Sequence, residues 1–259
     1  MEIGADTLNQ VLSSLKDYNP TAYDLMNRIS TALIPVAMVL LSLLLYMELA
    51  ETNKRLSTEQ GRLNMDIFIH VAWKYFVALA LVLLSGQIID SFMWLNSAIG
   101  RIINNTLARD VTFNFEMPTI QGRPKFIESG ILHGMFGLAQ MTVWLAEIVV
   151  KVLVFLRFFQ LYLFQAAMPI MVSSYISEEW KSVATGFIKQ FLALVIQGFL
   201  LILIVKLYSV VALDSMFEVA ASGDWETNLS NAFTILLKSG VFIFTLIGSQ
   251  TMAKRWMGV

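Results

Sequence analysis

The sequence contains no cysteine and, among its 259 residues, only two histidines and five prolines. The lack of cysteine excludes a disulfide framework, a thiolate metal site and a redox motif. His70 and His133 alone cannot form a site that needs several histidines from one chain. Charge is also scarce, because charged residues make up 14% of the chain, whereas soluble domains carry about 25%. An ordinary soluble domain is therefore excluded.

Hydrophobic side chains dominate the sequence. They make up 57% of the residues, with 18 Phe and 14 Met, and the mean hydropathy is +0.67. Long apolar runs of this kind predict an all-α membrane protein that crosses the bilayer several times, with five or six transmembrane helices. The net charge of −1 provides no overall attraction to a polyanion, so the lipid bilayer is the first partner that the composition predicts.

The first two spans are predicted from runs without charge. Ile29–Met47 has no charged residue and is rich in leucine, so it inserts by itself. Tyr75–Ile89 is also uncharged and continues past Asp90 to Leu95, which predicts a second helix over this stretch.

The third apolar stretch, Ile131–Ile176, is interrupted by Glu147, Lys151 and Arg157. Either two spans meet near Lys151, or one span follows an interfacial helix. Two further spans are predicted around Gln190–Val205 and Ser239–Ala253, each bounded by basic residues. The alternatives for the third stretch leave the total at five or six helices.

The spans divide the chain into four segments. These are an N-terminal amphipathic segment, the first two transmembrane helices, an extracytoplasmic loop and a C-terminal helical core, over residues 1–28, 29–95, 96–130 and 131–259. In the first segment Leu8, Val11, Leu12 and Leu15 recur at helical spacing after Asp6, a possible N-cap, which predicts a helix lying on the membrane or on a neighbour. Within the loop, apolar and polar residues alternate over Val111–Met117, which predicts a strand.

Orientation follows from the distribution of lysine and arginine in short loops. Asp214–Glu226 is acidic and without a base, which places it outside, whereas the Glu178–Lys189 loop and the C-terminus are basic enough to be cytoplasmic. The cytoplasmic loop supplies four candidate contacts with other subunits, namely Glu178, Glu179, Trp180 and Lys181. For the N-terminal half the charges are divided, and either orientation is open.

No nucleotide-binding loop, zinc-protease motif or serine nucleophile elbow is present, so we expect neither an enzyme nor a cofactor. Glu147 and Lys151 are four residues apart, in the favourable order for a pair on one helix face. They either neutralise each other near an interface or line a polar path or a seam between subunits. Arg157, Gln160 and Gln165 make the following helix too polar to face lipid on all sides.

Pro35 and Pro169 lie inside predicted spans, in the similar strings LIPVAM and QAAMPIMV, and are candidates for helix kinks. Interrupted helices at matching positions also occur in transporters built from repeats. A small-molecule transporter or permease subunit is therefore the alternative function, followed by a membrane-perturbing protein such as a holin.

The stretch Val154–Leu213 resembles the core of the TrbL family, the polytopic channel subunit of type IV secretion and conjugation machines. The shared features are Arg157 before an aromatic-rich helix, the Ala167–Pro169 motif, Trp180 in a short loop, and Gln197-Gly198 in a long apolar helix. The resemblance implies about five spans, an external N-terminus and a cytoplasmic C-terminus, with Ile131–Ile176 crossing once. It also implies a multi-pass protein of the inner membrane that assembles in several copies beside cytoplasmic ATPases.

The function predicted on this basis is a channel or scaffold subunit that helps DNA or protein to cross the inner membrane. Its energy would come from partner ATPases. A path for single-stranded DNA needs basic groups and aromatic rings, and the best candidates are Lys151, Arg157, Phe158, Phe159 and Tyr162. We expect Arg157 to face the conduit or a seam between copies of the chain.

Overall fold

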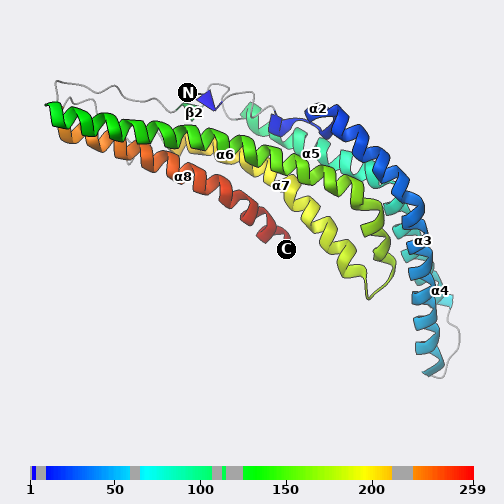
Figure 1. Cartoon of the computed structure of the whole chain (residues 1–259). Coiled ribbons are helices and arrows are strands. Elements are labelled where there is room, and N and C mark those ends of the chain that lie inside the picture. Colours follow the sequence, from blue (N-terminus) through cyan, green and yellow to red (C-terminus); the bar gives the residue numbers. More distant parts are fainter. Residues whose placement is uncertain (1, 4–9, 59–64, 107–112, 115–124, 212–223) are drawn as a thin grey trace. The chain divides into compact units, whose positions relative to one another are not determined.

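The computed structural model describes residues 2–3, 10–58, 65–106, 113–114, 125–211 and 224–259 (Figure 1). Nearly all of them are helical. The elements are β1 (Glu2–Ile3), α2 (Leu15–Tyr18), α3 (Pro20–Thr58), α4 (Met65–Leu83), α5 (Ser85–Thr106), β2 (Phe113–Asn114), α6 (Phe126–Ser173), η1 (Ser174–Ile176), α7 (Lys181–Val211) and α8 (Trp225–Met257).

Two of the long helices begin at caps that can be read in the sequence. The Asn19 side chain accepts a hydrogen bond from the Ala22 N–H at 3.0 Å, and Pro20 occupies the first helical position, where no N–H is needed. At the start of α6, the Glu128 carboxylate accepts from the Lys125 N–H at 3.0 Å, which is the returning half of a capping box. These caps set the starts of α3 and α6.

Three described helices are long and apolar enough to cross a membrane: Pro20–Lys54 of α3, Lys181–Tyr208 of α7, and α8. A fourth candidate is the pair Val71–Leu83 and Ser85–Ile103, which is bent by 70° at its break. The predicted second span over Tyr75–Leu95 is therefore not one straight helix. The predicted total of five or six spans is not confirmed.

The predicted third stretch falls almost entirely within α6, a continuous helix of 48 residues. At 1.5 Å per residue it is roughly 72 Å long, more than twice the thickness of a bilayer core. A continuous helix cannot reverse its direction, so two spans meeting near Lys151 are ruled out. Ile131–Ile176 can cross at most once.

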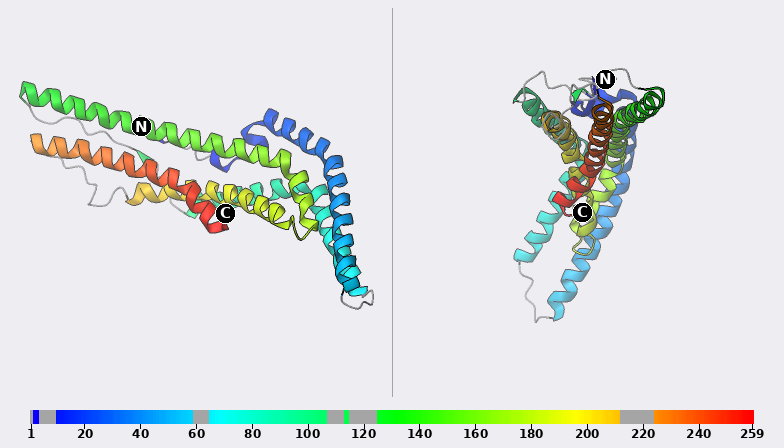
Figure 2. Two further views of the ribbon diagram at one scale, coloured as in Figure 1. Left: turned by 60° about the horizontal axis from the view of Figure 1, so that its bottom comes forward. Right: turned by 90° about the vertical axis from the view of Figure 1, so that its left-hand side faces the viewer.

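The chain forms two compact units, each built from non-consecutive segments. Unit 1 contains residues 1–12, 98–157 and 197–253, and unit 2 contains residues 13–97, 158–196 and 254–259. In unit 1, α6 and α8 lie side by side, and Ser239 donates a hydrogen bond to Thr142 at 2.8 Å (Figure 1). In unit 2, α3 packs along α4 (Figure 2), and Ile176 of η1 is buried against Leu41 and Ala78 of these helices.

The predicted N-terminal helix and the predicted strand each take a shorter form. Residues 10–12 are helical, and a separate short helix, α2, starts after Ser14, whose side chain accepts from the Asp17 N–H. Val11 and Leu15 are buried as the amphipathic pattern requires, whereas Asp6 and Leu8 lie outside the described residues. Two residues of the predicted strand pair with β1 in an antiparallel ladder; the rest of that strand also lies outside the described residues.

Candidate functional site

Arg157 is the largest fully buried side chain of the described part of the chain, and it lies in unit 1 on α6. Its Nη1 donates a hydrogen bond to the backbone oxygen of Val11 at 3.2 Å. Gly198 of α7 also lies against the guanidinium, and a Cβ there would overlap with three guanidinium atoms. Arg157 therefore occupies a space that exists because residue 198 has no side chain. It uses that position to hold the N-terminal segment, residues 10–19, by its backbone.

A second glycine makes room for the N-terminal segment in the same unit. A Cβ at Gly100 of α5 would overlap with Leu12 and would crowd Ile202 of α7. Leu12 therefore packs directly against the backbone of α5. With Val11 only 3% exposed, residues 11 and 12 are anchored both by a charged hydrogen bond and by apolar contact.

In unit 2 the N-terminal segment is held by two aromatic residues of α6. The Tyr162 hydroxyl donates to the Leu15 backbone oxygen at 2.6 Å and lies 3.3 Å from the Asn19 oxygen. The ring of Phe158 stacks on Tyr18 at 3.9 Å with an angle of 5° between the planes. Burial raises the pKa of the Tyr18 phenol above its usual value. We call Arg157, in unit 1, and Phe158 and Tyr162, in unit 2, the anchor residues of this segment.

These contacts change the interpretation of the predicted path residues. Arg157, Phe158 and Tyr162 are buried within their own chain, whereas Lys151 and Phe159 are exposed. The structure therefore favours an intramolecular role for Arg157. Its placement at a conduit or a subunit seam stays a prediction. Sequence reasoning missed the anchor because the acceptors are backbone oxygens of residues 11, 15 and 19, which carry no signal in the side-chain pattern.

Glu147 and Lys151 form the predicted pair on one face of α6. Lys151 Nζ lies 2.6 Å from Glu147 Oε1, and the lysine side chain is 60% exposed. Phe155 and Phe159 follow on the same exposed face at four-residue spacing. We call these four residues the outer stripe of α6. The stripe carries both a charged pair and aromatic rings at the surface of the chain.

The remaining polar candidates on α6 are the two glutamines. Gln160 is partly buried and Gln165 is fully buried, and Gln165 Oε1 has no hydrogen-bond partner among the described residues. Pro169 is buried and Pro35 is exposed, and both α6 and α3 continue as helices past their proline. The prolines are therefore accommodated inside continuous helices.

Of the four loop candidates, Glu178 contacts a partly buried charged pair, and the other three do not. Lys74 Nζ of α4 contacts Glu48 Oε1 of α3 at 3.2 Å and Glu178 Oε1 at 2.7 Å. The Glu178 N–H also donates to Glu48 Oε2 at 3.2 Å. We call these three residues the ion cluster. Glu179, Trp180 and Lys181 are exposed, and Lys181 lies over the Tyr175 ring.

The fold and the site define an α-helical membrane protein whose buried polar groups fasten its own segments to one another. In the described ranges, no three His, Asp or Glu side chains gather as a metal site would need. The chain belongs to the TrbL/VirB6 plasmid conjugal transfer-like family, whose model matches residues 5–169. No curated protein and no solved structure matches the chain. The family match includes the N-terminal segment and all three of its anchor residues on α6.

Proposed function

We propose that this protein is a channel or scaffold subunit of a type IV secretion machine, and that it helps DNA or protein to cross the inner membrane. The family match over residues 5–169 is the observation that carries this proposal. Several apolar helices support a location in the membrane. The machine's ATPases would supply the energy, and this chain would act without catalytic chemistry of its own.

The outer stripe of α6 is the surface that we assign to the conduit or to the seam between copies. An exposed charged pair followed by exposed phenylalanines is poorly suited to face lipid along its whole length. Lys151 supplies a positive charge, and Phe155 and Phe159 supply rings on which bases or apolar side chains can stack. Arg157 would join this surface only if the N-terminal segment left its backbone contacts.

The alternative of a small-molecule transporter has less support. It depends on interrupted helices at Pro35 and Pro169, and both helices continue through these residues. A helix break does occur at Leu84, between α4 and α5. It lies in neither of the two sequence strings that contain Pro35 and Pro169, so it does not support the predicted pair of interrupted helices.

Two experiments test the proposed function. The first is gentle extraction from the native membrane, crosslinking and mass spectrometry. Several copies recovered with secretion ATPases would support a machine subunit; a lone monomer that transports small molecules after reconstitution would refute it.

The second experiment compares Lys151→Ala with Lys189→Ala, a matched exposed lysine on α7. Breaking an exposed ion pair changes stability by less than about 1 kcal/mol, so the level of each variant in the membrane should stay constant. Transfer should fall at least about tenfold for Lys151→Ala and not for Lys189→Ala, since a path loses a basic contact only in the first variant. Equal transfer by both variants would refute the assignment of the outer stripe to the conduit.

A further inference from the structure

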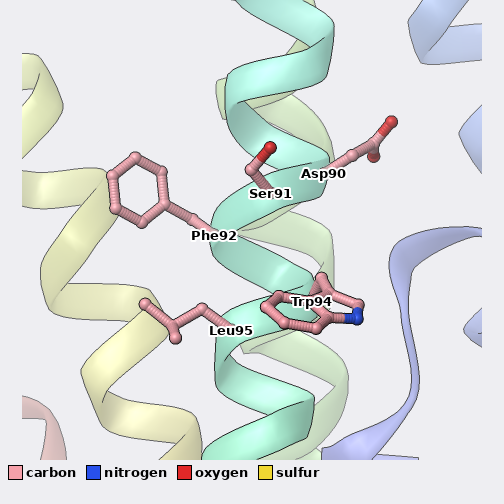
Figure 3. Close-up of a pocket in the computed structure, with 5 residues that line it drawn as sticks. All are labelled: Asp90, Ser91, Phe92, Trp94 and Leu95. Carbon is pink, nitrogen blue, oxygen red and sulfur yellow. The ribbon is translucent and has the colours of Figure 1, made fainter.

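A hollow of about 560 Å³ lies along α5 in unit 2, just after the bend from α4 (Figure 3). It is lined by Asp90, Ser91, Phe92, Trp94 and Leu95. Asp90 and Trp94 project from the same side of α5, one turn apart, whereas Phe92 and Leu95 point to the other side. A volume of this size is typical of sites for small ligands or lipid head groups.

The acid in this hollow is held in place by a hydrogen bond, and no basic side chain in the described part of the chain neutralises it. The Tyr23 hydroxyl of α3 donates to Asp90 Oδ2 at 2.9 Å. No lysine or arginine of the described residues forms a salt bridge with Asp90. Asp90 is exposed, and Trp94 beside it is 70% exposed. A carboxylate one helical turn from an exposed indole ring is a pair of groups that attracts a cation.

The depth of Asp90 in the membrane follows from its bond to Tyr23. Tyr23 precedes Ile29, the start of the uncharged run of α3, by six residues, or roughly 9 Å of helix. The head-group region extends about 5–8 Å beyond the hydrocarbon core on each side. Asp90 therefore lies at the outer edge of the head-group region when α3 crosses the bilayer, within reach of the lipid head groups. Trp94 is at the depth where tryptophan side chains concentrate.

The bend and the amphipathic surface of α5 also fit a helix at the membrane surface. A helix that leaves α4 at 70° runs close to the membrane plane when α4 crosses the bilayer. The exposed residues of α5 include the polar Gln87, Asp90, Ser91 and Arg101 and the apolar Trp94, Leu95 and Ile102. Such a surface can contact head groups and acyl chains at once.

We propose that this hollow binds a phospholipid whose head group carries an ammonium, with Asp90 and Trp94 holding the ammonium and Phe92 and Leu95 contacting the acyl chains. An anionic head group would be repelled by Asp90. Tyr23 acts as a positioning residue, because its hydroxyl orients the carboxylate. The site is independent of the proposed conduit, which we assign to α6.

The test is native mass spectrometry of the purified chain offered phosphatidylethanolamine or phosphatidylglycerol with identical acyl chains. The wild type should retain phosphatidylethanolamine in preference to phosphatidylglycerol. Asp90→Asn should weaken that retention at least about tenfold, since a charged hydrogen bond is lost. The substitution keeps an oxygen that accepts from Tyr23, so the fold is preserved. Trp94→Ala should weaken retention by about threefold or more through loss of the cation–π contact.

Matched variants control for nonspecific effects. Asp24→Asn removes another exposed carboxylate from α3, and Trp144→Ala removes another exposed indole from α6; both should bind lipid as the wild type does. Equal retention of the two lipids, or undiminished binding by Asp90→Asn, would overturn the proposal. Equally tight binding of free ethanolamine would overturn the assignment to a lipid.

Discussion

Gly198 and Gly186 lie on the same helix, α7, but the same substitution should affect them in opposite ways. A Cβ at Gly198 would overlap with Cζ, Nη1 and Nη2 of Arg157, whereas a Cβ at Gly186 would meet no atom within 4 Å. The guanidinium belongs to a flexible side chain. It is nevertheless fully buried and bonded to Val11, so it cannot move aside without breaking that contact.

The expected size of the effect follows from three contributions. Overpacking of a buried site costs about 1–3 kcal/mol, and loss of a hydrogen bond from a charged group costs about 1.5–3 kcal/mol. Alanine recovers about 1 kcal/mol over glycine in a helix interior. Gly198→Ala should therefore destabilise the protein by about 1.5–5 kcal/mol, while Gly186→Ala should stabilise it by up to about 1 kcal/mol.

The assay is reversible unfolding in mixed micelles, followed by tryptophan fluorescence. Because the chain has no cysteine, Gln10→Cys can be added to each variant as a single reporter of the N-terminal segment. Its thiol should react faster in the Gly198→Ala background than in the Gly186→Ala background. Arg157→Lys, with a slimmer cationic end, should partly rescue Gly198→Ala. Equal stability and equal labelling of the two alanine variants would refute the close packing of Arg157 on Gly198.

Two further predictions concern the Tyr162 hydrogen bond and the ion cluster. Tyr162→Phe removes the hydroxyl that bonds Leu15 and should cost about 1 kcal/mol, with faster labelling of the N-terminal segment and unchanged labelling elsewhere; an unaltered unfolding curve would contradict this. Glu48→Gln should cost about 3 kcal/mol, since it removes the more buried of the two carboxylates that pair with a largely buried ammonium. Glu178→Gln, at a 56% exposed side chain, should cost less than about 1 kcal/mol; the reverse order in thermal stability would show that the cluster depends on Glu178.

The helical class could be predicted because it depends on local properties of the sequence, and the same kind of property marks the start of α3, which lies nine residues before the predicted run at Ile29. Composition predicts membrane helices, and Asn19-Pro20 indicates the beginning of α3 by its capping chemistry. The break at Leu84 was not predicted, because it lies within an apolar run that contains no proline. Ser85-Gly86 follows it directly and is a local signal for a kink that the hydrophobic pattern outweighed.

The site was predictable in its residues but not in its contacts. Arg157 and Gly198 both belong to the motif that carries the family resemblance, yet nothing in the sequence shows that the guanidinium packs against the glycine. Their contact requires the pairing of α6 with α7. Likewise, Glu147 and Lys151 could be paired from spacing alone, since both lie on one helix. Lys74 and Glu48 could not, because their pairing depends on how α3 packs against α4.

The ion cluster links the orientation of the N-terminal half to that of the turn before α7. Glu48 lies late in α3, Lys74 lies early in α4, and Glu178 lies in the turn before α7, all within unit 2. Their contacts place the end of α3 and the turn at the same face of the membrane. If the turn is cytoplasmic, as its neighbouring lysines predict, then the end of α3 is cytoplasmic too. The beginning of α3 must then face the outside.

Single cysteines can test this orientation directly. We expect Asn53→Cys, at the end of α3, and Ser182→Cys, at the start of α7, to react with a membrane-impermeant maleimide only from the cytoplasmic side. Lys16→Cys, on α2, should react only from the outside. All three side chains are exposed in the chain, so a failure to react cannot be ascribed to burial within it. Labelling of Asn53→Cys and Ser182→Cys from opposite sides would contradict the ion cluster, because one membrane face could not then hold both ends of a 2.7 Å contact between Lys74 and Glu178.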